Sequence, residues 1–342
     1  MNYYNIWLTN KCVLNCKYCY EHIENSKKTN MEKHIAEKVI SFIKKQDRLV
    51  ERVNFHGGEP LLSYEIMEHF VKKLISINPN IKFSFTTNGA VWNRQIYDLL
   101  DTYKNNFESG ITVSIDGNKK IHDLNRQYPS GEGSYDHMLK TLTELKSIFC
   151  SIRGRMTITP ETVRYIYKSV VHLQQLNINI ITHAFDYFNN TWTNDDIRLI
   201  KEEYEKVIMF WKQNRNVNIS FADGLGLRMK KKEKCSLNIN IGVDGNIYPC
   251  SYTVNNEEYI IGNVENGVLE NKVENYKRNI LCKDNEFCEK CSNKDYCISN
   301  RCKFLNKAIT GNYYMPSGIA CALENVENSL LIRYKENFIN VR

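Results

Sequence analysis

The sequence contains no hydrophobic run long enough to cross a membrane and no secretory signal at its start. A membrane-spanning helix needs about 18 consecutive apolar residues, and no segment of the 342 residues approaches that length. The first residues lack the apolar region of a signal peptide, because Asn2, Asn5, Asn10 and Lys11 interrupt them. We therefore expect a cytoplasmic protein with no membrane partner.

Cysteine, in contrast, is abundant. The sequence holds 12 cysteines, and in a chain without a secretory signal this number favours metal binding over disulfides. Three of them lie on one short stretch with the spacing C-x3-C-x2-C, directly after the β-like run Tyr4 to Leu8: Cys12, Cys16 and Cys19.

Three thiolates on one loop can hold three irons of a [4Fe–4S] cube, because soft thiolates suit iron–sulfur clusters. This stretch lacks the fourth cysteine that would close such a cluster, so the fourth iron would stay open to an external ligand, as in catalytic metal sites. The alternatives are a zinc knuckle or three buried thiols. Zinc usually takes a local fourth ligand, and the nearest candidate is His22. We favour the open cluster.

The stretch resembles the signature of the radical S-adenosylmethionine (SAM) superfamily, in which an aromatic residue, here Tyr18, precedes the last cysteine. The resemblance implies that Tyr18 belongs to the cofactor-binding site. The resemblance implies that Cys12, Cys16 and Cys19 hold a catalytic cluster whose open iron binds the amino and carboxylate groups of SAM. An electron from that cluster would split SAM into methionine and a 5′-deoxyadenosyl radical, which abstracts a substrate hydrogen. The protein's part would be to position and shield this radical.

The charge balance gives little sign of a nucleic-acid partner. The formal net charge is +7, but thiolates bound in three clusters would remove about four or five of these charges. The densest basic run, Lys230 to Lys232 with Lys234, lacks the interleaved aromatic residues of a single-strand-binding groove. We interpret this run as a solvated loop and expect no nucleic-acid binding.

From residue 31 to about 213, helix-like and strand-like segments alternate, which is typical of a parallel α/β sheet. The predicted helices are Met31 to Gln46, Ser63 to Ile77, Asn93 to Tyr103, Ser134 to Phe149, Glu161 to Leu176 and Asn194 to Gln213. The predicted strands are Tyr4 to Leu8, Arg52 to Phe55, Ile81 to Thr86, Ile111 to Ile115, Ile152 to Ile158 and Ile178 to Ala184. Six β/α units are too few to close an eight-stranded barrel. The resemblance implies a partial (β/α)6 barrel, open on one side for a large substrate.

Polar and glycine-rich motifs follow the second and third predicted strands, at the end where such barrels carry their chemistry. Gly57 and Gly58 allow close backbone approach to a ligand, and Glu59 can accept hydrogen bonds from an ammonium group. In this context, Gly-Gly-Glu resembles the family motif that binds the SAM amino group, whereas we interpret His56 as structural. Thr87 and Asn88, in a Thr-Asn-Gly turn, resemble an element of the SAM pocket.

Further cofactor candidates follow the fourth and fifth strands. By resemblance to peptide maturases, Ser114 and Arg126 contact the SAM carboxylate or ribose, and Asp116 lies in the same pocket. An arginine can hold a carboxylate through two parallel hydrogen bonds; the alternative for Arg126 is a surface ion pair. Thr157, at the end of the fifth strand, is predicted to touch adenine. We interpret Cys150, which stands alone, as a small buried hydrophobe.

The periodic pattern ends near residue 215. Asp223 to Gly226 is predicted to be a connecting loop, and Asn238 to Cys250 a β-hairpin with Asp-Gly in its turn, preceded by Cys235. Cys288, Cys291, Cys297 and Cys302 follow with the spacing C-x2-C-x5-C-x4-C, and Cys321 comes last. A single zinc ribbon would not use seven ordered cysteines.

This pattern resembles the SPASM extension of radical SAM peptide maturases, an α+β domain with two auxiliary [4Fe–4S] clusters. The spacing between Cys297 and Cys302 is one residue longer than usual. By resemblance, the first auxiliary cluster is held by Cys235, Cys250 and Cys302, and the second by Cys288, Cys291, Cys297 and Cys321. Cys282 is an uncertain fourth ligand of the first cluster; otherwise that cluster is open. The predicted domains are a radical SAM core at 1–215 and a SPASM domain at 216–342.

The resemblance predicts an oxidoreductase that modifies a ribosomally synthesised peptide and forms an intramolecular thioether or carbon–carbon crosslink. A flavodoxin or ferredoxin would donate electrons. Because the chain begins directly at the first strand, we expect the peptide either to need a separate leader-recognition protein or to dock on the barrel mouth itself. The first alternative is an anaerobic sulfatase-maturating enzyme, which forms formylglycine. That family has an aspartate base after the hairpin cysteine, whereas this chain has Ser251, a poor base. A second alternative is a non-catalytic iron–sulfur or zinc protein.

Overall fold

The computed structural model describes residues 3–21, 28–46, 49–107, 110–227, 237–295, 297 and 302–334. The chain forms two compact units. The first comprises Met1–Ser114, Asp123–Ile152 and Leu237–Glu274, and the second Ile115–His122, Arg153–Ser236 and Asn275–Arg342. Each unit therefore contains segments from both sides of the predicted boundary at residue 215, and the division into domains 1–215 and 216–342 stays a prediction.

The first unit is built on a sheet with the strand order β11–β10–β9–β8–β1–β2–β3–β4. Its strands are β1 (Tyr3–Thr9), β2 (Arg52–Gly57), β3 (Lys82–Thr87), β4 (Ile111–Ser114), β8 (Ile239–Ile241), β9 (Asn246–Tyr248), β10 (Gly262–Asn263) and β11 (Gly267–Val268). Strands β1 to β4 are parallel, and β8 joins β1 in parallel. The hairpin predicted between residues 238 and 250 is confirmed as antiparallel β8 and β9.

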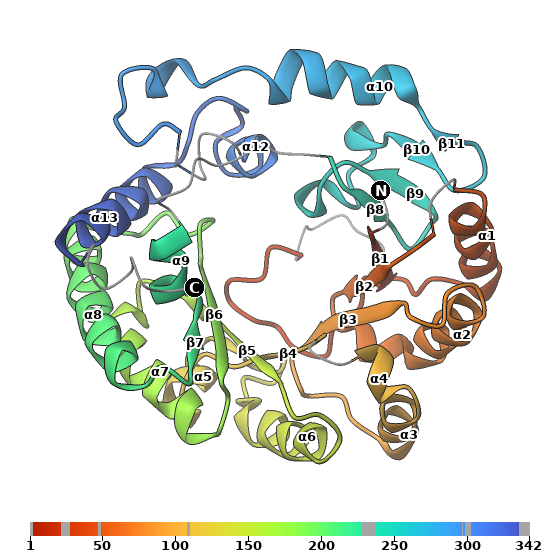
Figure 1. The fold of residues 1–342 in the computed structure, drawn as a ribbon, viewed down its shortest axis with the longest axis horizontal. Helices are drawn as coiled ribbons and strands as arrows, with labels where there is room; N and C mark the ends of the chain where they lie inside the picture. Colours follow the sequence, from red (N-terminus) through yellow and green to blue (C-terminus); the bar gives the residue numbers. More distant parts are fainter. Residues whose placement is uncertain are drawn as a thin grey trace. The chain divides into compact units, whose positions relative to one another are not determined.

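Helices cover one face of this sheet because alternate strand residues are apolar. They are α1 (Lys33–Lys44), α2 (Tyr64–Ile75), α3 (Arg94–Thr102), α4 (Lys104–Phe107) and α6 (Tyr135–Ile148). Tyr4 of β1 packs edge-on against Phe42 of α1, with ring centroids 6.5 Å apart. Phe55 of β2 similarly contacts Phe70 of α2. Figure 1 shows α1, α2 and α3 following the outer side of β1 to β3.

The opposite face of the same strands carries a ladder of polar side chains. The amide of Asn54 donates to Oδ1 of Asn5 at 3.1 Å, and the Ser84 hydroxyl donates to Oδ1 of Asn54 at 2.8 Å. Asn5 in turn donates to Oδ1 of Asn240 on β8 at 2.9 Å. These bonds satisfy buried amides and fix the C-terminal hairpin to the first strand of the chain.

The second unit has three parallel strands, β5 (Arg153–Ile158), β6 (Ile180–Phe185) and β7 (Asn218–Ile219). Its longer helices are α7 (Ile166–Gln175), α8 (Asn194–Gln213), α9 (Ser220–Leu227), α12 (Lys303–Thr310) and α13 (Gly318–Tyr334). A capping box of Thr193 and Asp196 starts α8. Helix α13 packs against α8, so the C-terminal segment completes this unit (Figure 1).

The α/β class is confirmed, and the six predicted strands are present and are parallel within each unit. The helix predicted at 194–213 has the observed bounds, and the other predicted helices and strands agree with the structure to within a few residues. Short helix α5 (Lys119–Asn125) and strand β7 were not predicted.

Two local predictions are wrong. The segment Asp223 to Gly226 lies in α9 rather than in a loop. Glycine disfavours helix by about 1 kcal/mol, but tertiary contacts hold this segment: Phe221 stacks on Tyr204, and the Trp211 indole donates to Asp223. Cys150 is exposed rather than buried, because it follows α6 in the turn before β5.

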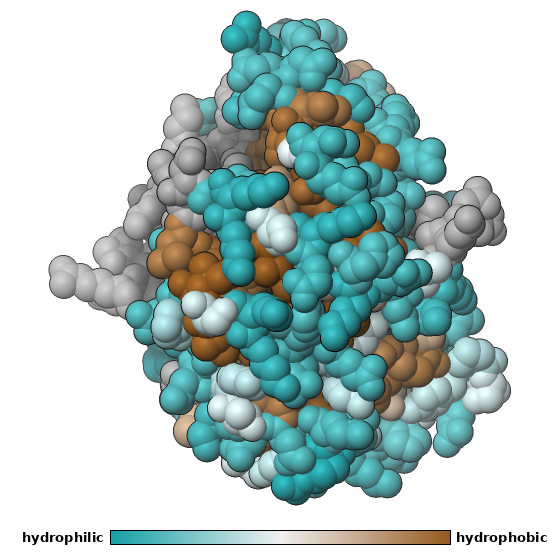
Figure 2. Space-filling view, turned by 90° about the vertical axis from the view of Figure 1, so that its right-hand side faces the viewer, coloured by the Kyte–Doolittle hydropathy of each residue, from teal (hydrophilic) through white to brown (hydrophobic). Residues whose placement is uncertain are grey.

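The face in Figure 2 carries hydrophobic side chains in patches separated by hydrophilic ones. Exposed large hydrophobic residues belong to different elements, for example Met209 on α8 and Leu269 before Glu270. Within the described ranges, every helix is too short or too polar to span a bilayer.

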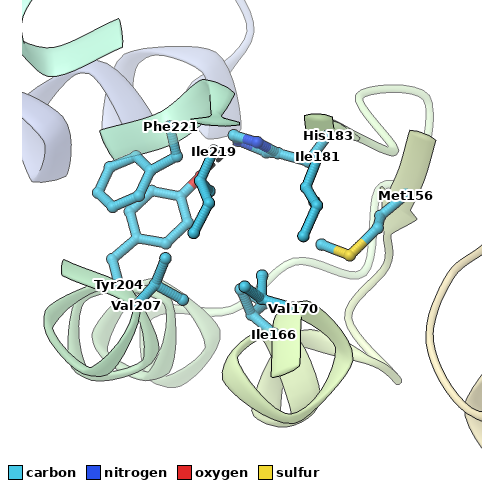
Figure 3. Close-up of a pocket in the computed structure, with 9 residues that line it drawn as sticks. All are labelled: Met156, Ile166, Val170, Ile181, His183, Tyr204, Val207, Ile219 and Phe221. Atoms are coloured by element: carbon cyan, nitrogen blue, oxygen red, sulfur yellow. Dashed lines mark hydrogen bonds between the residues drawn. The ribbon is translucent and has the colours of Figure 1, made fainter. Parts of the chain in front are cut away.

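A small cavity in the second unit lies between the strands β5 to β7 and the helices α7 and α8. It has room for about one water molecule, and apolar side chains line most of it (Figure 3). His183 borders it, with Nε2 2.7 Å from the Tyr204 hydroxyl and Nδ1 3.1 Å from the Ser220 hydroxyl. Burial, with the nearby charge of Arg155, lowers the pKa of His183 to about 4.

This pKa makes the second unit less stable in acid. The unfolded chain takes a proton on His183 near pH 6.5, whereas the folded chain takes it only near pH 4, so stability present above pH 6.5 is lost as the pH falls. We expect His183 to lower the free energy of unfolding by roughly 2 kcal/mol between pH 7 and pH 5. Urea denaturation at both pH values measures this, and His183→Gln should reduce the difference. If His183→Gln shows the same difference in unfolding free energy between pH 7 and pH 5 as the exposed control His34→Gln, the lowered pKa of His183 is contradicted.

Candidate functional site

The loop with the three cysteines begins where β1 ends and is held by the segment around residue 126. The amide of Asn15 donates to the Gln127 carbonyl at 2.7 Å, and the amide of Lys17 donates to the Asn125 carbonyl at 3.0 Å. These two bonds join the loop to a segment more than 100 residues away in the sequence. They fix the path of the backbone between Cys12 and Cys19.

Gly57 and Gly58 lie directly against the start of this loop. A Cβ atom on Gly57 would come 2.2 Å from the Thr9 carbonyl oxygen, and one on Gly58 would come 2.4 Å from that of Lys11. The amide of Gly58 donates to Thr9 at 3.1 Å, and that of Glu59 to Lys11 at 2.9 Å. Because they lack a Cβ, the two glycines allow the backbone at the end of β2 to approach the cysteine loop itself.

Glu59 is fully buried and connects the loops that follow β2 and β3. Its Oε1 accepts from the Leu61 amide and the Thr87 hydroxyl, at 3.2 and 2.9 Å, and its Oε2 accepts from the Asn88 amide at 2.7 Å. Burial raises the pKa of Glu59 to about 7, and these donors oppose the rise. A carboxylate has about four acceptor positions, and the protein itself fills three of those of Glu59. Binding of SAM by Glu59 stays a prediction.

Asn88 connects this carboxylate to the first cysteine. Its side-chain amide lies 3.3 Å from Cys12 Sγ and donates to it, while its Oδ1 accepts from the Ala90 amide at 2.8 Å. Three motifs far apart in the sequence therefore meet: Cys12 after β1, Glu59 after β2, and Thr87 with Asn88 at the end of β3.

Burial keeps the thiols of the loop neutral unless a metal binds them. Burial raises the pKa of Cys12 to about 12 and that of Cys19 to about 11, although Arg126 and backbone donors oppose the rise. A bound metal reverses this effect, because it deprotonates a coordinating thiol outright. In the part of the chain that the structure describes, no three Cys, His, Asp or Glu side chains converge on a single ion. A cube would bind each thiolate at a different iron, whereas a mononuclear site needs all its ligands on one ion.

Arg126 and Ser114 belong to the same unit as the cysteine loop, and both are buried. The guanidinium of Arg126 lies over the Tyr18 ring, 5.2 Å from its centroid. Arg126 is therefore buried beside Cys19 and Tyr18, and its contact with SAM stays a prediction.

Asp116 and Thr157 meet in the second unit. The buried Asp116 carboxylate accepts a hydrogen bond from the Thr157 amide at 2.8 Å. Asp116 therefore fixes the end of β5. Contact of either residue with SAM stays a prediction.

The sequence analysis missed a cluster beside the cysteine loop. Trp7 stacks on His56, with ring centroids 4.5 Å apart and planes at 15°, and its indole lies 3.4 Å from Glu21 Oε1. Burial raises the pKa of Glu21 to about 7. The alternation of β1 and β2 was the one available signal, because it places Trp7 and His56 on the face opposite the helices.

A second missed feature connects the cysteine loop to the segment after Cys250. Asn10 and Asn255 exchange side-chain hydrogen bonds at 3.3 and 3.2 Å, and the rings of Tyr20 and Tyr252 lie 5.6 Å apart. The residues of each pair are more than 230 positions apart, so no local pattern indicates these contacts.

Three of the four cysteines predicted for the second auxiliary cluster lie near one another in the second unit. The Cys291 amide donates to the Cys288 carbonyl at 3.0 Å. Burial raises the pKa of Cys321, and the charges of Cys288 and Cys291 raise it further. The side chain of Asn293 donates to Asn325 of α13 at 3.2 Å, which ties the cysteine segment to that helix. Participation of Cys297 stays a prediction.

The contacts described above do not bring together the cysteines predicted to hold the first auxiliary cluster. Cys250 belongs to the first unit, Cys302 and Cys282 belong to the second, and Cys235 lies outside the described residues. Cys282 is exposed and follows the π-helical turn Tyr276–Leu281. This ligand set stays a prediction.

The glycine contacts give a direct test. Gly58→Ala should displace the loop at Lys11 and Cys12, because its Cβ would lie 2.4 Å from a carbonyl oxygen. We expect the variant to lose about four irons per chain after reconstitution, measured by iron and sulfide analysis. Gly318→Ala is the matched control, since nothing lies within 4 Å of its added Cβ. Full iron content in Gly58→Ala would contradict this account.

Known proteins are similar to parts of this chain in sequence. Residues 6–173 match the radical SAM superfamily. The chain is 29% identical over 177 residues to an uncharacterized protein of Methanocaldococcus jannaschii, covering 51% of this chain and 59% of the relative. It is 29% identical over 170 residues to a cysteine-type anaerobic sulfatase-maturating enzyme of Clostridium novyi, covering 47% and 44%. It is 28% identical over 189 residues to the radical SAM cyclopropyl synthase TigE of Paramaledivibacter caminithermalis, covering 51% and 38%. The chain thus matches less than two thirds of each relative's length.

Solved structures show the same fold over nearly the whole chain. The sulfatase-maturating enzyme anSMEcpe with bound AdoMet superposes with a TM-score of 0.83 at 20% identity, covering 100% of this chain and 96% of that one. Streptococcus suis SuiB bound to the precursor peptide SuiA gives a TM-score of 0.67 at 17% identity, covering 93% and 75%. Together with the cysteine loop after β1, these findings place a radical SAM domain at residues 6–173, and the fold similarity extends through the cysteine-rich C-terminal region.

Proposed function

We propose that this protein is a peptide maturase. It would cleave SAM to a 5′-deoxyadenosyl radical and abstract a hydrogen from a ribosomally synthesised peptide, giving an intramolecular thioether or carbon–carbon crosslink. The observation that carries the proposal is the meeting of three loops at Cys12: Asn88 donates to its sulfur, and Gly58 packs against the Lys11 carbonyl directly before it.

The chain's own residues would bind and orient the cofactor. Cys12, Cys16 and Cys19 would hold a [4Fe–4S] cluster that supplies the electron for SAM cleavage. Glu59 would take the SAM ammonium group with its remaining acceptor position, and Arg126 would take the carboxylate. Burial of these two side chains strengthens both contacts, because few waters compete for them.

Two auxiliary clusters would accept the electron released when the crosslink forms. The proximity of Cys288, Cys291 and Cys321 supports one of them. A peptide substrate is supported by the similarity to SuiB, whose structure holds the precursor peptide SuiA. A flavodoxin or ferredoxin would reduce the enzyme.

Anaerobic reconstitution tests this proposal. We expect about twelve irons per chain and release of 5′-deoxyadenosine from SAM in the presence of dithionite. Replacing Cys12, Cys16 and Cys19 together by alanine should leave about eight irons and abolish SAM cleavage, because the auxiliary sites remain. About four irons, or zinc, in the unmodified protein with no cleavage would refute the assignment.

Formylglycine formation is the second candidate, favoured by the TM-score of 0.83 to anSMEcpe. Ser251, at the start of the 3-10 turn Ser251–Thr253, offers no carboxylate to remove a substrate proton. We therefore expect a cysteine-containing sulfatase peptide to remain unmodified, while a short Cys- or aromatic-rich peptide encoded beside the gene loses two hydrogens. Mass spectrometry of both peptides after reaction with SAM distinguishes the candidates, and a formylglycine product would overturn our preference.

A further inference from the structure

The backbone of Arg126 is held on two sides. The carbonyls of its neighbours Asn125 and Gln127 accept from the cysteine loop, at 3.0 and 2.7 Å. Its own carbonyl accepts from the Ser134 amide and hydroxyl, at 3.1 and 3.0 Å. Consecutive carbonyls therefore point to opposite sides, as in an extended strand. Arg126 is thus attached to the loop that would carry the cluster.

The side chain of Arg126 is set by an aromatic ring of the same loop. Its guanidinium carbon lies 5.2 Å from the centroid of the Tyr18 ring, within the range of a cation–π interaction. Arg126 is 6% exposed, and Tyr18 is partly buried. A cation–π contact gains strength when water is excluded from it. Because a guanidinium has several rotatable bonds before it, this ring restricts where its donors point.

We propose that Tyr18 is a positioning residue that holds the Arg126 guanidinium over its ring, so that Arg126 presents its donors to the carboxylate of SAM. The inference rests on the proposed function, in which Arg126 binds that carboxylate. In this arrangement SAM binding depends on the conformation of the cysteine loop, because Tyr18, which lies between Cys16 and Cys19, orients Arg126. A chain whose loop is displaced would then bind SAM weakly even with Arg126 present.

The experiment is a double-mutant cycle on the reconstituted full-length protein, with SAM affinity measured by calorimetry without reductant. Tyr18→Leu should weaken SAM binding about tenfold, the size expected of a partly desolvated cation–π contact. Tyr18→Phe keeps the ring face and should stay within about twofold. Tyr20→Leu is the matched control, because the ring of Tyr20 packs on Tyr252. Iron content is measured on every variant.

The cycle separates positioning from direct contact between Tyr18 and SAM. If Tyr18 acts through Arg126, Tyr18→Leu should have no further effect in an Arg126→Gln background. Binding of 5′-deoxyadenosine, which lacks the carboxylate, should be equal in Tyr18→Leu and the unmodified protein. If Tyr18→Leu and Arg126→Gln weaken SAM binding additively, or if Tyr18→Leu binds 5′-deoxyadenosine more weakly than the unmodified protein, the inference is wrong.

A second variant keeps the inference testable even when Tyr18→Leu fails to hold its cluster. Replacing Tyr18 by a fluorinated phenylalanine keeps the shape of the ring and weakens its negative face. We expect this variant to keep its iron and to bind SAM more weakly than Tyr18→Phe; equal affinities would overturn the inference. Failure of the unmodified, iron-loaded protein to bind SAM would instead refute the proposed function.

Discussion

The close approach of β2 to the cysteine loop is the constraint on which the site depends. Hydrogen bonds from the amides of Gly58 and Glu59 hold this approach, and it leaves no room for a Cβ at residue 57 or 58. Glu59 is buried as a consequence and organises Thr87 and Asn88. Asn88 then reaches Cys12, so a backbone contact between two neighbouring strands sets the position of donors from a third.

The polar ladder also joins the cysteine-rich region to this sheet. Asn5, Asn54 and Ser84 satisfy one another on the face without helices, and Asn5 extends the ladder to Asn240. The hairpin of the cysteine-rich region is thereby part of the same sheet as the first strand. The Asn10–Asn255 pair repeats the connection beside the cysteine loop. A region that reads as a separate C-terminal domain is thus built partly into the sheet of the N-terminal one.

Burial near the loop has chemical consequences. The thiols of Cys12 and Cys19 are held in surroundings that disfavour a free thiolate. Such thiols are stable as metal ligands or as neutral groups. Glu21 and Glu59, with pKa values raised to about 7, show that negative charge in this region is costly unless a cation compensates it.

The sequence by itself determined the α/β class, the bounds of the main helices and strands, and the motifs at Cys12 to Cys19 and Gly57 to Glu59. Hydrophobic periodicity and short motifs are local, so they can be read without contacts. Only the tertiary structure decided that Gly58 meets Lys11, that Arg126 lies over Tyr18, and that Trp7 stacks on His56. It also decided that Asp223 to Gly226 is helical and that Cys150 is exposed. These outcomes depend on contacts between segments distant in the chain, which override local propensity.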